Sequence, residues 1–484
     1  MPEHDGSQLP RSLAANPRLS SWVRIDPEGY VALSPGKVEI GQGILTALAQ
    51  IAADELDVSI DRIRLVPAST AYSPDEGVTS GSLSVQDCGS ALAFACAEIK
   101  ALFLRSASQR FGIPADAFEV EAGLVRGPGN LRTSYWELTE SVDLDRAATA
   151  SVPPKRPADR RLVGRSVGRI DIPGKVFGTR PFVHDLALPD MLHGRVVRPA
   201  AEGAKLVSVE EAAVRAVPGF VAVVRDGNFL GVLAESEEAA IKCQDRLAAG
   251  ASWSGSEALP DETDLAEWLK SAPCETTVVE QRSSGAPAPD VIRTISREYS
   301  RPYIAHASIA PSCALAWWDG DKVKVWTHTQ GVFNLRSDLA IMLGKMPEDI
   351  IITHVEGAGC YGHNGADDVA LDAVLLARAA GGRPVRLQWS RRDELTKSPC
   401  GAAMAIRVEA DLANRIVGWR HDIWSNGHVA RPGRTEHPTL RAASEIANGW
   451  EPCIAINPPQ ATGGGADRNA VPLYDFPAWD IVSH

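Results

Sequence analysis

Apolar and polar positions alternate along this chain in the patterns of short strands and of amphipathic or buried helices. Apolar residues recur with the helical period in three stretches, at 44–56, 90–110 and 368–379. Strand-like runs at 30–40 and 350–355 come before two of these helices. The order of the elements predicts a mixed fold of the α+β or α/β class.

Each predicted helix begins after a polar loop that contains glycine: Lys37 to Gly43, Thr79 to Gly89 and Glu356 to Asp368. Glycine has no Cβ, so the backbone can take positive φ and approach a bound group closely. Free N–H groups and the helix dipole at a helix N-terminus favour an anion such as a phosphate. One such loop is equally compatible with a tight turn that binds nothing, but three together favour a long anionic ligand. None has the GxxxxGK(S/T) or GxGxxG spacing of the common nucleotide-binding loops.

Length and local composition suggest how the chain is divided. A chain of 484 residues predicts about three domains. Pro153-Pro-Lys-Arg-Pro-Ala-Asp-Arg-Arg161 is rich in proline and basic residues, which is typical of a linker. We expect a disordered lead-in at 1–18, a first segment at 19–150, a linker at 151–161, a second unit at 162–250, a polar connector at 251–290 and a third unit at 291–484.

Shorter patterns predict the remaining elements. Residues 118–126 have the pattern of a hairpin, and three short strands at 192–198, 220–224 and 229–234 come before a helix at 236–247. Further strands are expected at 323–330, 383–390, 417–425 and 479–482.

The charge balance narrows the choice of partners. The chain has 49 basic and 61 acidic residues, which argues against binding to nucleic acid or to an anionic membrane surface. No run of 18 apolar residues is present, so no membrane-spanning helix is expected. The N-terminal residues lack a basic region followed by an apolar one, so we expect no secretory signal and a cytoplasmic location.

The eight cysteines are scattered, with no C-x-x-C pair. This spacing argues against an iron–sulfur cluster or a structural zinc site within the chain. Most of the cysteines are expected to be small buried side chains. Cys360 differs from the others because it lies inside the third glycine loop.

The three loops together, with Lys37-Val-Glu-Ile-Gly-Gln-Gly43 first, resemble the molybdopterin-binding (large) subunit of the xanthine dehydrogenase and aldehyde oxidase family. Within it, the chain is most similar to the branch of nicotinate dehydrogenase and isoquinoline 1-oxidoreductase large (beta) chains. In that branch the Gly-Gln-Gly segment stands at the N-terminus. The resemblance implies a permuted molybdopterin-binding segment at 19–150, an α/β hammerhead domain at 162–250 and a molybdopterin-binding domain at 291–484.

The resemblance also implies roles for individual residues. Gln330 matches a glutamine that hydrogen-bonds to an oxygen of the molybdenum centre, which an amide can do without adding charge. A glutamine taken by itself is more often a polar residue that caps a strand end, but the presence of the three loops favours the cofactor role for Gln330. Tyr361 replaces the usual phenylalanine of a Gly-Gly-Phe-Gly run, and Gln330 and Tyr361 are the catalytic candidates. No residue of this chain is implied as a direct metal ligand. The implied cofactor-binding residues are Gly41, Gln42, Gly43, Ser80, Gly81, Ser82, Gln330, Gly331, Gly359, Cys360, Tyr361 and Gly362.

Two departures from the family pattern bear on activity. Gly365 stands where purine-oxidising relatives have a glutamate, which favours a smaller N-heteroaromatic or an aldehyde. The family's base glutamate, in a Val-Gly-Glu-Pro turn, has no match, because Gly449-Trp450 precedes the late Glu451-Pro452. We therefore expect either a split enzyme, in which a second molybdopterin-binding chain supplies the glutamate, or an incomplete product. The strand at 479–482 should then leave the fold open for a second chain to continue.

The implied reaction is hydroxylation of a carbon next to a ring nitrogen, in nicotinate or an isoquinoline-like ring, with water as the oxygen source. The implied cofactor is molybdenum–molybdopterin cytosine dinucleotide. Electrons would pass to 2Fe–2S clusters on a small partner subunit, and a cytochrome c subunit is a further partner that the resemblance allows. A partner that carries a signal would place the complex in the periplasm. Two alternatives stay open, an aldehyde oxidoreductase large subunit and a non-catalytic cofactor-holding subunit.

Overall fold

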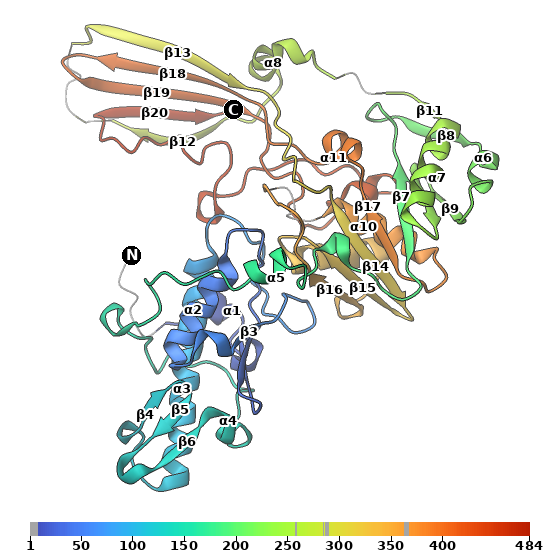
Figure 1. The fold of residues 1–484 in the computed structure, drawn as a ribbon. Coiled ribbons are helices and arrows are strands. Elements are labelled where there is room, and N and C mark those ends of the chain that lie inside the picture. The colour runs from blue at the N-terminus through green and yellow to red at the C-terminus, as the bar shows by residue number, and fades with distance from the viewer. Residues whose placement is uncertain (1–7, 257–258, 284, 286–289, 363–366) are drawn as a thin grey trace. The chain divides into compact units, whose positions relative to one another are not determined.

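The computed structural model describes residues 8–256, 259–283, 285, 290–362 and 367–484 (Figure 1). The chain forms two compact units. The first contains Met1–Leu192, Ser312–Cys360 and Asn364–Gln388, and the second contains His193–Pro311, Tyr361–His363 and Trp389–His484. No helix in the described ranges is long and apolar enough to cross a membrane.

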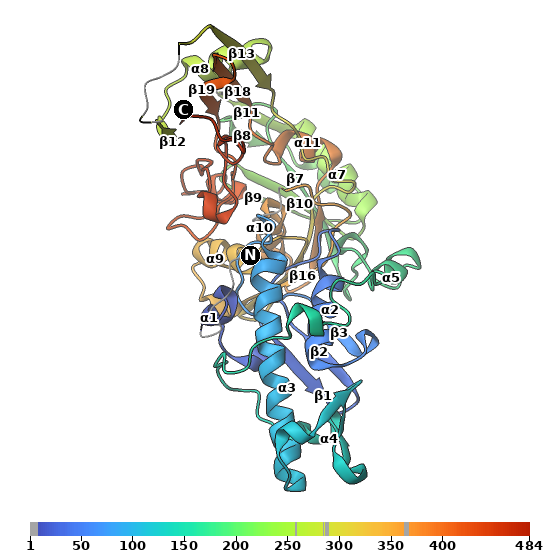
Figure 2. The same cartoon turned by 90° about the vertical axis from the view of Figure 1, so that its left-hand side faces the viewer.

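The N-terminal part of the first unit is a small sheet covered by two helices. The sheet consists of β1 (Val23–Asp26), β2 (Tyr30–Leu33) and β3 (Ile63–Leu65), and α2 (Ile44–Leu56) connects the parallel pair β2 and β3. The long helix α3 (Ser90–Phe111) packs against α2 (Figure 2). The two helices match the predicted spans. The predicted strand at 30–40 ends at Leu33, because Pro35 cannot donate to a sheet.

Alanine allows α2 and α3 to lie close together. Ala49 and Ala52 of α2 and Ala91 and Ala95 of α3 are all fully buried. Beyond α3, the predicted hairpin is confirmed as β4 (Glu119–Glu121) and β5 (Leu124–Arg126), joined by β6 (Arg132–Ser134) and α4 (Tyr135–Leu138).

The prediction of a disordered lead-in is wrong for residues 8–18. Helix α1 (Arg11–Ala15) forms there, and the side chain of Leu13 is fully buried in the same core as α2 and α3. Apolar burial therefore orders a segment whose composition indicated disorder. Residues 1–7 lie outside the described ranges.

The proline-rich stretch at 151–161 is also not a free linker. The buried carboxylate of Asp54 in α2 accepts hydrogen bonds from the N–H groups of Arg161 (3.1 Å), Leu162 (2.9 Å) and Val163 (2.8 Å). Lys155 adds an ion pair to Asp57, with 2.6 Å between Nζ and Oδ1. Burial would raise the pKa of Asp54, but the three N–H groups and Lys155 outweigh it and lower that pKa. Residues 155–163, which we call the strap, are therefore bound to α2 and to Asp57 after it.

The rest of the first unit is a layered α/β arrangement. Its strands lie in the order β16, β15, β14 and β17, and β15 runs parallel to β16 across helix α9. Helix α10 packs on β14 and is almost entirely buried, as its continuous apolar sequence predicts. The bounds of these elements are β14 (Cys313–Asp319), β15 (Lys322–Thr327), α9 (Val332–Leu343), β16 (Ile350–His354), α10 (Asp368–Arg378) and β17 (Val385–Gln388).

The second unit begins with the predicted order of short strands and a helix. In this part β10 (Phe229–Ala234) pairs with β7 (Leu192–Val197) and with β9 (Phe220–Asp226), and α7 (Glu237–Gly250) packs on β10. The boundary expected at 161/162 is wrong, because residues 162–192 group with the first unit. That this region is an α/β hammerhead domain stays a prediction. Smaller elements are β8 (Lys205–Val209), α6 (Ala212–Arg215) and β11 (Ala251–Ser254).

A five-stranded sheet forms the rest of the second unit (Figure 1). The C-terminal strand β20 pairs with β12 on one side and with β19 on the other, so the expectation of an open edge at 479–482 is wrong. The polar connector at 251–290 supplies β12, which its composition did not indicate. In sheet order the strands are β12 (Thr277–Arg282), β20 (Ala478–Ser483), β19 (Ile416–Ser425), β18 (Met404–Leu412) and β13 (Arg293–Arg301), with helices α8 (Leu265–Ser271) and α11 (Arg391–Lys397) in the same unit.

Candidate functional site

Thr79 joins three of the predicted site segments within the first unit. Its Oγ1 accepts a hydrogen bond from the N–H of Val38, in the first loop, at 3.0 Å. Its N–H donates to the carbonyl oxygen of Gln330 at 2.9 Å, and its carbonyl oxygen accepts from Nε2 of Gln330 at 2.9 Å. Both side chains are buried, so these bonds are protected from water. The structure thus brings the first loop, the second loop and the Gln330 segment together.

The third loop reaches the same place through Cys360. Its Sγ donates to Oε1 of Gln330 at 3.3 Å. The Gln330 amide is therefore held at both ends, which fixes the side chain in one orientation. Gln330 lies in the connection after β15 rather than at the end of a longer strand, and Gly331 is the N-cap residue of α9.

The rest of the third loop is divided between the units. Gly359 has φ of +108° and Gly362 has φ of +106°, which only glycine adopts without strain. Tyr361 and Gly362 group with the second unit, where the Tyr361 carbonyl oxygen lies 2.9 Å from Nδ1 of His306. The Tyr361 side chain is 54% exposed. Gly365 lies outside the described residues.

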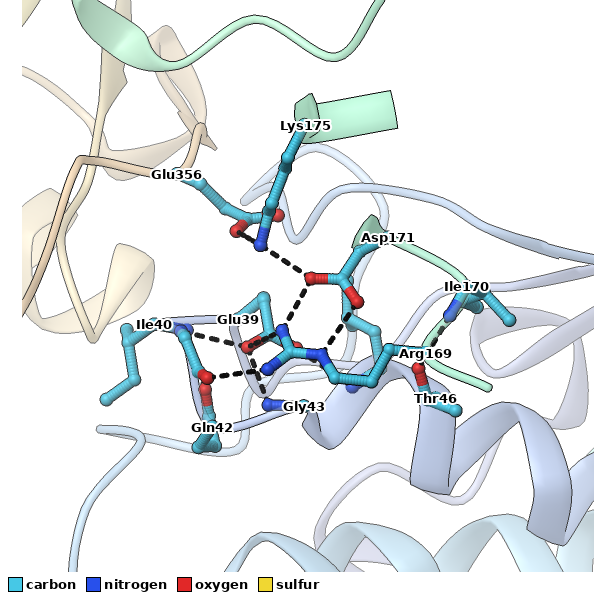
Figure 3. A network of polar contacts seen from close by, with 12 residues as sticks. Glu39, Ile40, Gln42, Gly43, Thr46, Arg169, Ile170, Asp171, Lys175 and Glu356 are labelled. Carbon is cyan, nitrogen blue, oxygen red and sulfur yellow. Dashed lines mark hydrogen bonds and ion pairs between the residues drawn. The ribbon is translucent and has the colours of Figure 1, made fainter. Parts of the chain in front are cut away.

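The Gly41-Gln42-Gly43 loop is occupied by a carboxylate of the chain itself. Oε1 of the buried Glu39 accepts from the N–H of Gly41 at 2.9 Å and of Gly43 at 2.8 Å, and Oε2 accepts from Leu45 at 3.3 Å (Figure 3). The expectation that free N–H groups here attract a phosphate is therefore wrong. A neighbouring side chain has already satisfied the N-terminus of α2.

Two features of this loop still suit a bound group. Gly41 has φ of +105°, and a Cβ built there would meet no atom within 4 Å, so the space beside it is open. Gln42 is exposed, and its side chain folds back on the loop, with Oε1 2.7 Å from the N–H of Ile40 and Nε2 3.0 Å from the carbonyl oxygen of Val38. A flat polar group can approach the loop at Gly41.

The second loop offers backbone donors. Gly81 has φ of +66° and Ser82 has φ of +61°, and Ser80 and Ser82 are exposed. Within the described part of the chain, the N–H groups of residues 80–82 have no hydrogen-bond acceptor. Of the three predicted loops, this one fits the anionic end of a ligand, because consecutive N–H groups in such a turn form an anion-binding concavity.

His354 ties the end of β16 to the first loop. Its ring nitrogens lie 3.0 Å from the carbonyl oxygen of Thr329 and 3.1 Å from that of Glu39. Burial lowers the pKa of His354 to about 4, and the two carbonyl groups oppose this only in part. The low pKa leaves the ring neutral at pH 7, so it has one N–H and donates to only one of these two carbonyl oxygens.

Sequence reasoning missed a set of charged residues around these loops. The set includes Glu356, which lies at the start of the third loop and is 7% exposed. The one sequence signal was the i, i+4 spacing of Asp171 and Lys175. Arg169 and Asp171 are two positions apart, and the contacts with Glu39 and Glu356 join positions far apart in the chain. The members are Arg180 and, as Figure 3 shows, Glu39, Arg169, Asp171, Lys175 and Glu356.

The cysteines and the other potential metal ligands are dispersed over the described residues. None of the eight cysteines, all of which are described, forms a disulfide, and Cys88, Cys96, Cys243 and Cys313 are buried, as expected for small core residues. Among the described residues, no group of three or more His, Cys, Asp or Glu side chains could hold a metal ion.

Two families, both described as molybdopterin cofactor-binding domains, match residues 5–157 and 282–450. The chain is 36% identical over 471 residues to a nicotinate dehydrogenase subunit of Pseudomonas putida, which covers 95% of this chain. It belongs to the molybdopterin-binding family of xanthine dehydrogenase and aldehyde oxidase. The chain is also 25% identical over 489 residues to the isoquinoline 1-oxidoreductase beta chain of Brevundimonas diminuta, which covers 87% of the chain.

This molybdopterin-binding chain spans only part of each of these relatives, 38% of the Pseudomonas protein and 61% of the Brevundimonas protein. Its fold is similar to that of aldehyde oxidoreductase from Desulfovibrio gigas, with a TM-score of 0.51 and 16% identity. That similarity covers 68% of this chain and 39% of the other, and it supports the fold alone.

Proposed function

We propose that this chain is the molybdenum-cofactor-binding subunit of a molybdo-hydroxylase that hydroxylates an N-heteroaromatic such as nicotinate or an isoquinoline-like ring, with water as the oxygen source. The observation that carries the proposal is the 36% identity to the Pseudomonas nicotinate dehydrogenase subunit over 95% of the chain. The convergence of the predicted segments at Thr79 and Gln330 is consistent with it, because one extended ligand needs all of them in one place.

The residues present fit a molybdopterin. The open backbone at Gly41 accepts a flat ring, and the N–H groups of Ser80, Gly81 and Ser82 suit the anionic end. Gln330 keeps a second N–H and a further lone pair beyond its bonds to Thr79 and Cys360, and its orientation is already fixed. The bound group supplies the two-electron oxidation. A neutral amide beside it adds a hydrogen bond without adding charge.

The finer details of the cofactor and the partners belong to this proposal. We expect the cytosine dinucleotide form of the cofactor, a small subunit with 2Fe–2S clusters and a second molybdopterin-binding chain that supplies the base glutamate. The scattered cysteines support the need for an iron–sulfur partner. Glu451 is exposed in the second unit, which does not suit the base of a water-excluding site. A cytoplasmic location is part of the same proposal.

The test is purification of the complete complex followed by turnover of nicotinate in water labelled with oxygen-18. We expect molybdenum, iron and pterin in the complex, and one labelled oxygen in the hydroxylated product. Gln330→Leu should lose activity, whereas Gln109→Leu, at an exposed position of α3, should retain it. Oxidation of aldehydes but not of nicotinate would indicate an aldehyde oxidoreductase. A loaded complex that oxidises neither would indicate a non-catalytic, cofactor-holding subunit, and a complex without molybdenum would exclude the proposal.

A further inference from the structure

An unbroken row of alternating charges connects the first and third loops of the first unit (Figure 3). The row begins at Glu39, which lies 3.6 Å from Arg169, and Arg169 lies 2.6 Å from Asp171. Lys175 comes next, 2.6 Å from Asp171 and 2.5 Å from Glu356. Arg180 ends the row, 2.7 Å from Glu356, and each distance joins a nitrogen to a carboxylate oxygen. Three carboxylates and three cations balance, so the row has no net charge.

One end of the row holds the backbone of the first loop. Glu39 accepts the N–H groups of Gly41 and Gly43, and Arg169 donates from Nη1 to the carbonyl oxygen of Gly41 at 2.9 Å. The N–H of Ile170 donates to Oγ1 of Thr46, in the first turn of α2, at 3.1 Å. The loop is therefore fixed through its own peptide groups as well as through side chains.

The other end of the row holds the start of the third loop. Lys175 and Arg180 each bind one carboxylate oxygen of Glu356, and the Glu356 carbonyl oxygen accepts from the N–H of Val183 at 2.8 Å. Glu356 is more than 300 positions from Glu39 in sequence, so no local element sets the distance between the two loops.

The three carboxylates of the row are buried, so each needs a nearby cation to offset the cost of burying its charge. Asp171 is 1% exposed, Glu39 is 1% exposed and Glu356 is 7% exposed. The hydrogen bond from Arg169, aided by Lys175, holds the pKa of Asp171 well below its usual range against the effect of burial. Removal of one cation would leave a buried carboxylate short of a partner, which is far more costly than the loss of an exposed ion pair.

We propose that the segment Arg169–Arg180 is a positioning clamp, in which Lys175 couples the two loops and so sets how tightly the chain holds molybdopterin. This inference rests on the proposed function, in which both loops contact the cofactor. Lys175 links the two loops because it forms one ion pair with Asp171, towards the first loop, and another with Glu356, in the third loop. It has no bond to Glu39 or to Gly41, so its effect on the first loop must pass through Asp171 and Arg169.

The effect of Lys175 on the first loop is tested first in the cofactor-free chain, by hydrogen exchange of the backbone amides in the peptide spanning residues 38–46. Lys175→Met should speed exchange in this peptide about tenfold, because it breaks the buried ion pair between Lys175 and Asp171. Asp171 is in turn linked to the loop through Arg169. Lys175→Arg keeps both pairs and should restore slow exchange. Lys324→Met is the matched control, because Lys324 makes a 2.6 Å ion pair with Asp319 at the surface of the same unit. If Lys175→Met folds poorly, Glu356→Gln provides the same comparison, since it weakens the bonds to Lys175 and Arg180 with little change in volume.

Cofactor retention is tested in the complete complex, by molybdenum and pterin content during extended dialysis. Lys175→Met should lose both several times faster than the unaltered complex, and Lys175→Arg should resemble the unaltered complex. An unaltered complex without molybdenum would overturn the proposed function and leave the exchange experiment to judge the clamp. A loaded complex in which Lys175→Met retains cofactor normally, with unchanged exchange at residues 38–46, would overturn the clamp alone.

Discussion

The side chain of Gln330 donates from Nε2 to the carbonyl oxygen of Thr79 at 2.9 Å, across 251 positions of sequence. The N–H of Thr79 donates back to the Gln330 carbonyl oxygen at the same distance. A reciprocal pair of buried hydrogen bonds thus joins two segments of the first unit that are far apart in sequence. A cofactor that contacts both segments would meet a surface that is already assembled.

Substitution of Gln330 should therefore reduce stability even without cofactor. Gln330→Leu leaves the Thr79 carbonyl oxygen buried without the amide donor, which costs about 1–3 kcal/mol in the free energy of unfolding. Urea denaturation of the cofactor-free chain measures this. Gln109→Leu, at an exposed position of α3, should change the free energy little. An unchanged midpoint for Gln330→Leu would show that the reciprocal bonds do not hold the segments together.

The first loop has room for a methyl group at Gly41, but the backbone there has a conformation that only glycine adopts without strain. A Cβ at Gly41 or at Gly168 would meet no atom within 4 Å, but only Gly41 has positive φ. Gly41→Ala should therefore destabilise the chain by about 1–3 kcal/mol through backbone strain. Gly168→Ala should be neutral or slightly stabilising. Thermal unfolding of the two variants makes the comparison, and equal effects would contradict the backbone explanation.

His354 should make the first unit less stable in mild acid. Its folded-state pKa, about 4, lies below the ordinary value of 6.5. Between these values the unfolded chain binds the proton and the folded chain does not, so the free energy of unfolding falls as the pH falls from 6.5 to 4. The loss approaches roughly 3 kcal/mol at the lower end. The stability of His354→Gln should depend less on pH across this range, and an unchanged slope would contradict the role of His354.

The strap at residues 155–163 should detach from α2 more often when the negative charge of Asp54 is removed. Asp54→Asn removes the negative charge, and its NH2 group faces donors in either orientation: the N–H groups of Arg161, Leu162 and Val163, or Lys155 and the N–H of Arg161. Trypsin should then cleave after Lys155, Arg160 or Arg161 much faster, and stability should fall by about 1–3 kcal/mol. Asp159→Asn removes only an exposed pair with Arg156 and is the control. Equal cleavage rates in the two variants would count against the strap.

Local patterns in the sequence were sufficient for many elements of the fold. The helix at 44–56 was predicted to the residue, and α10 ends one position before its predicted end. These predictions held because helical periodicity and the position of glycine act over a few residues. The strand predicted at 323–330 instead ends at Thr327, since the tertiary bonds of Gln330 draw the last residues out of the sheet.

Predictions that required the path of the chain in space were less successful. The strand at 479–482 has the same alternating pattern whether it lies at an edge or inside a sheet, and only its pairing with both β12 and β19 shows which is true. Similarly, the composition of residues 151–161 is typical of a linker, but it does not reveal that Asp54 holds the following peptide groups.

The sequence by itself determined the family, the helices and the glycine loops at which they start, because each depends on neighbouring residues. The tertiary structure alone decided what fills those loops: Glu39 occupies the first, and Thr79 and Gln330 bind each other. It also decided that Lys175 stands between Asp171 and Glu356. Hydrogen bonds and ion pairs require atoms within about 3 Å, and for residues separated by hundreds of positions that proximity arises only when the whole unit folds.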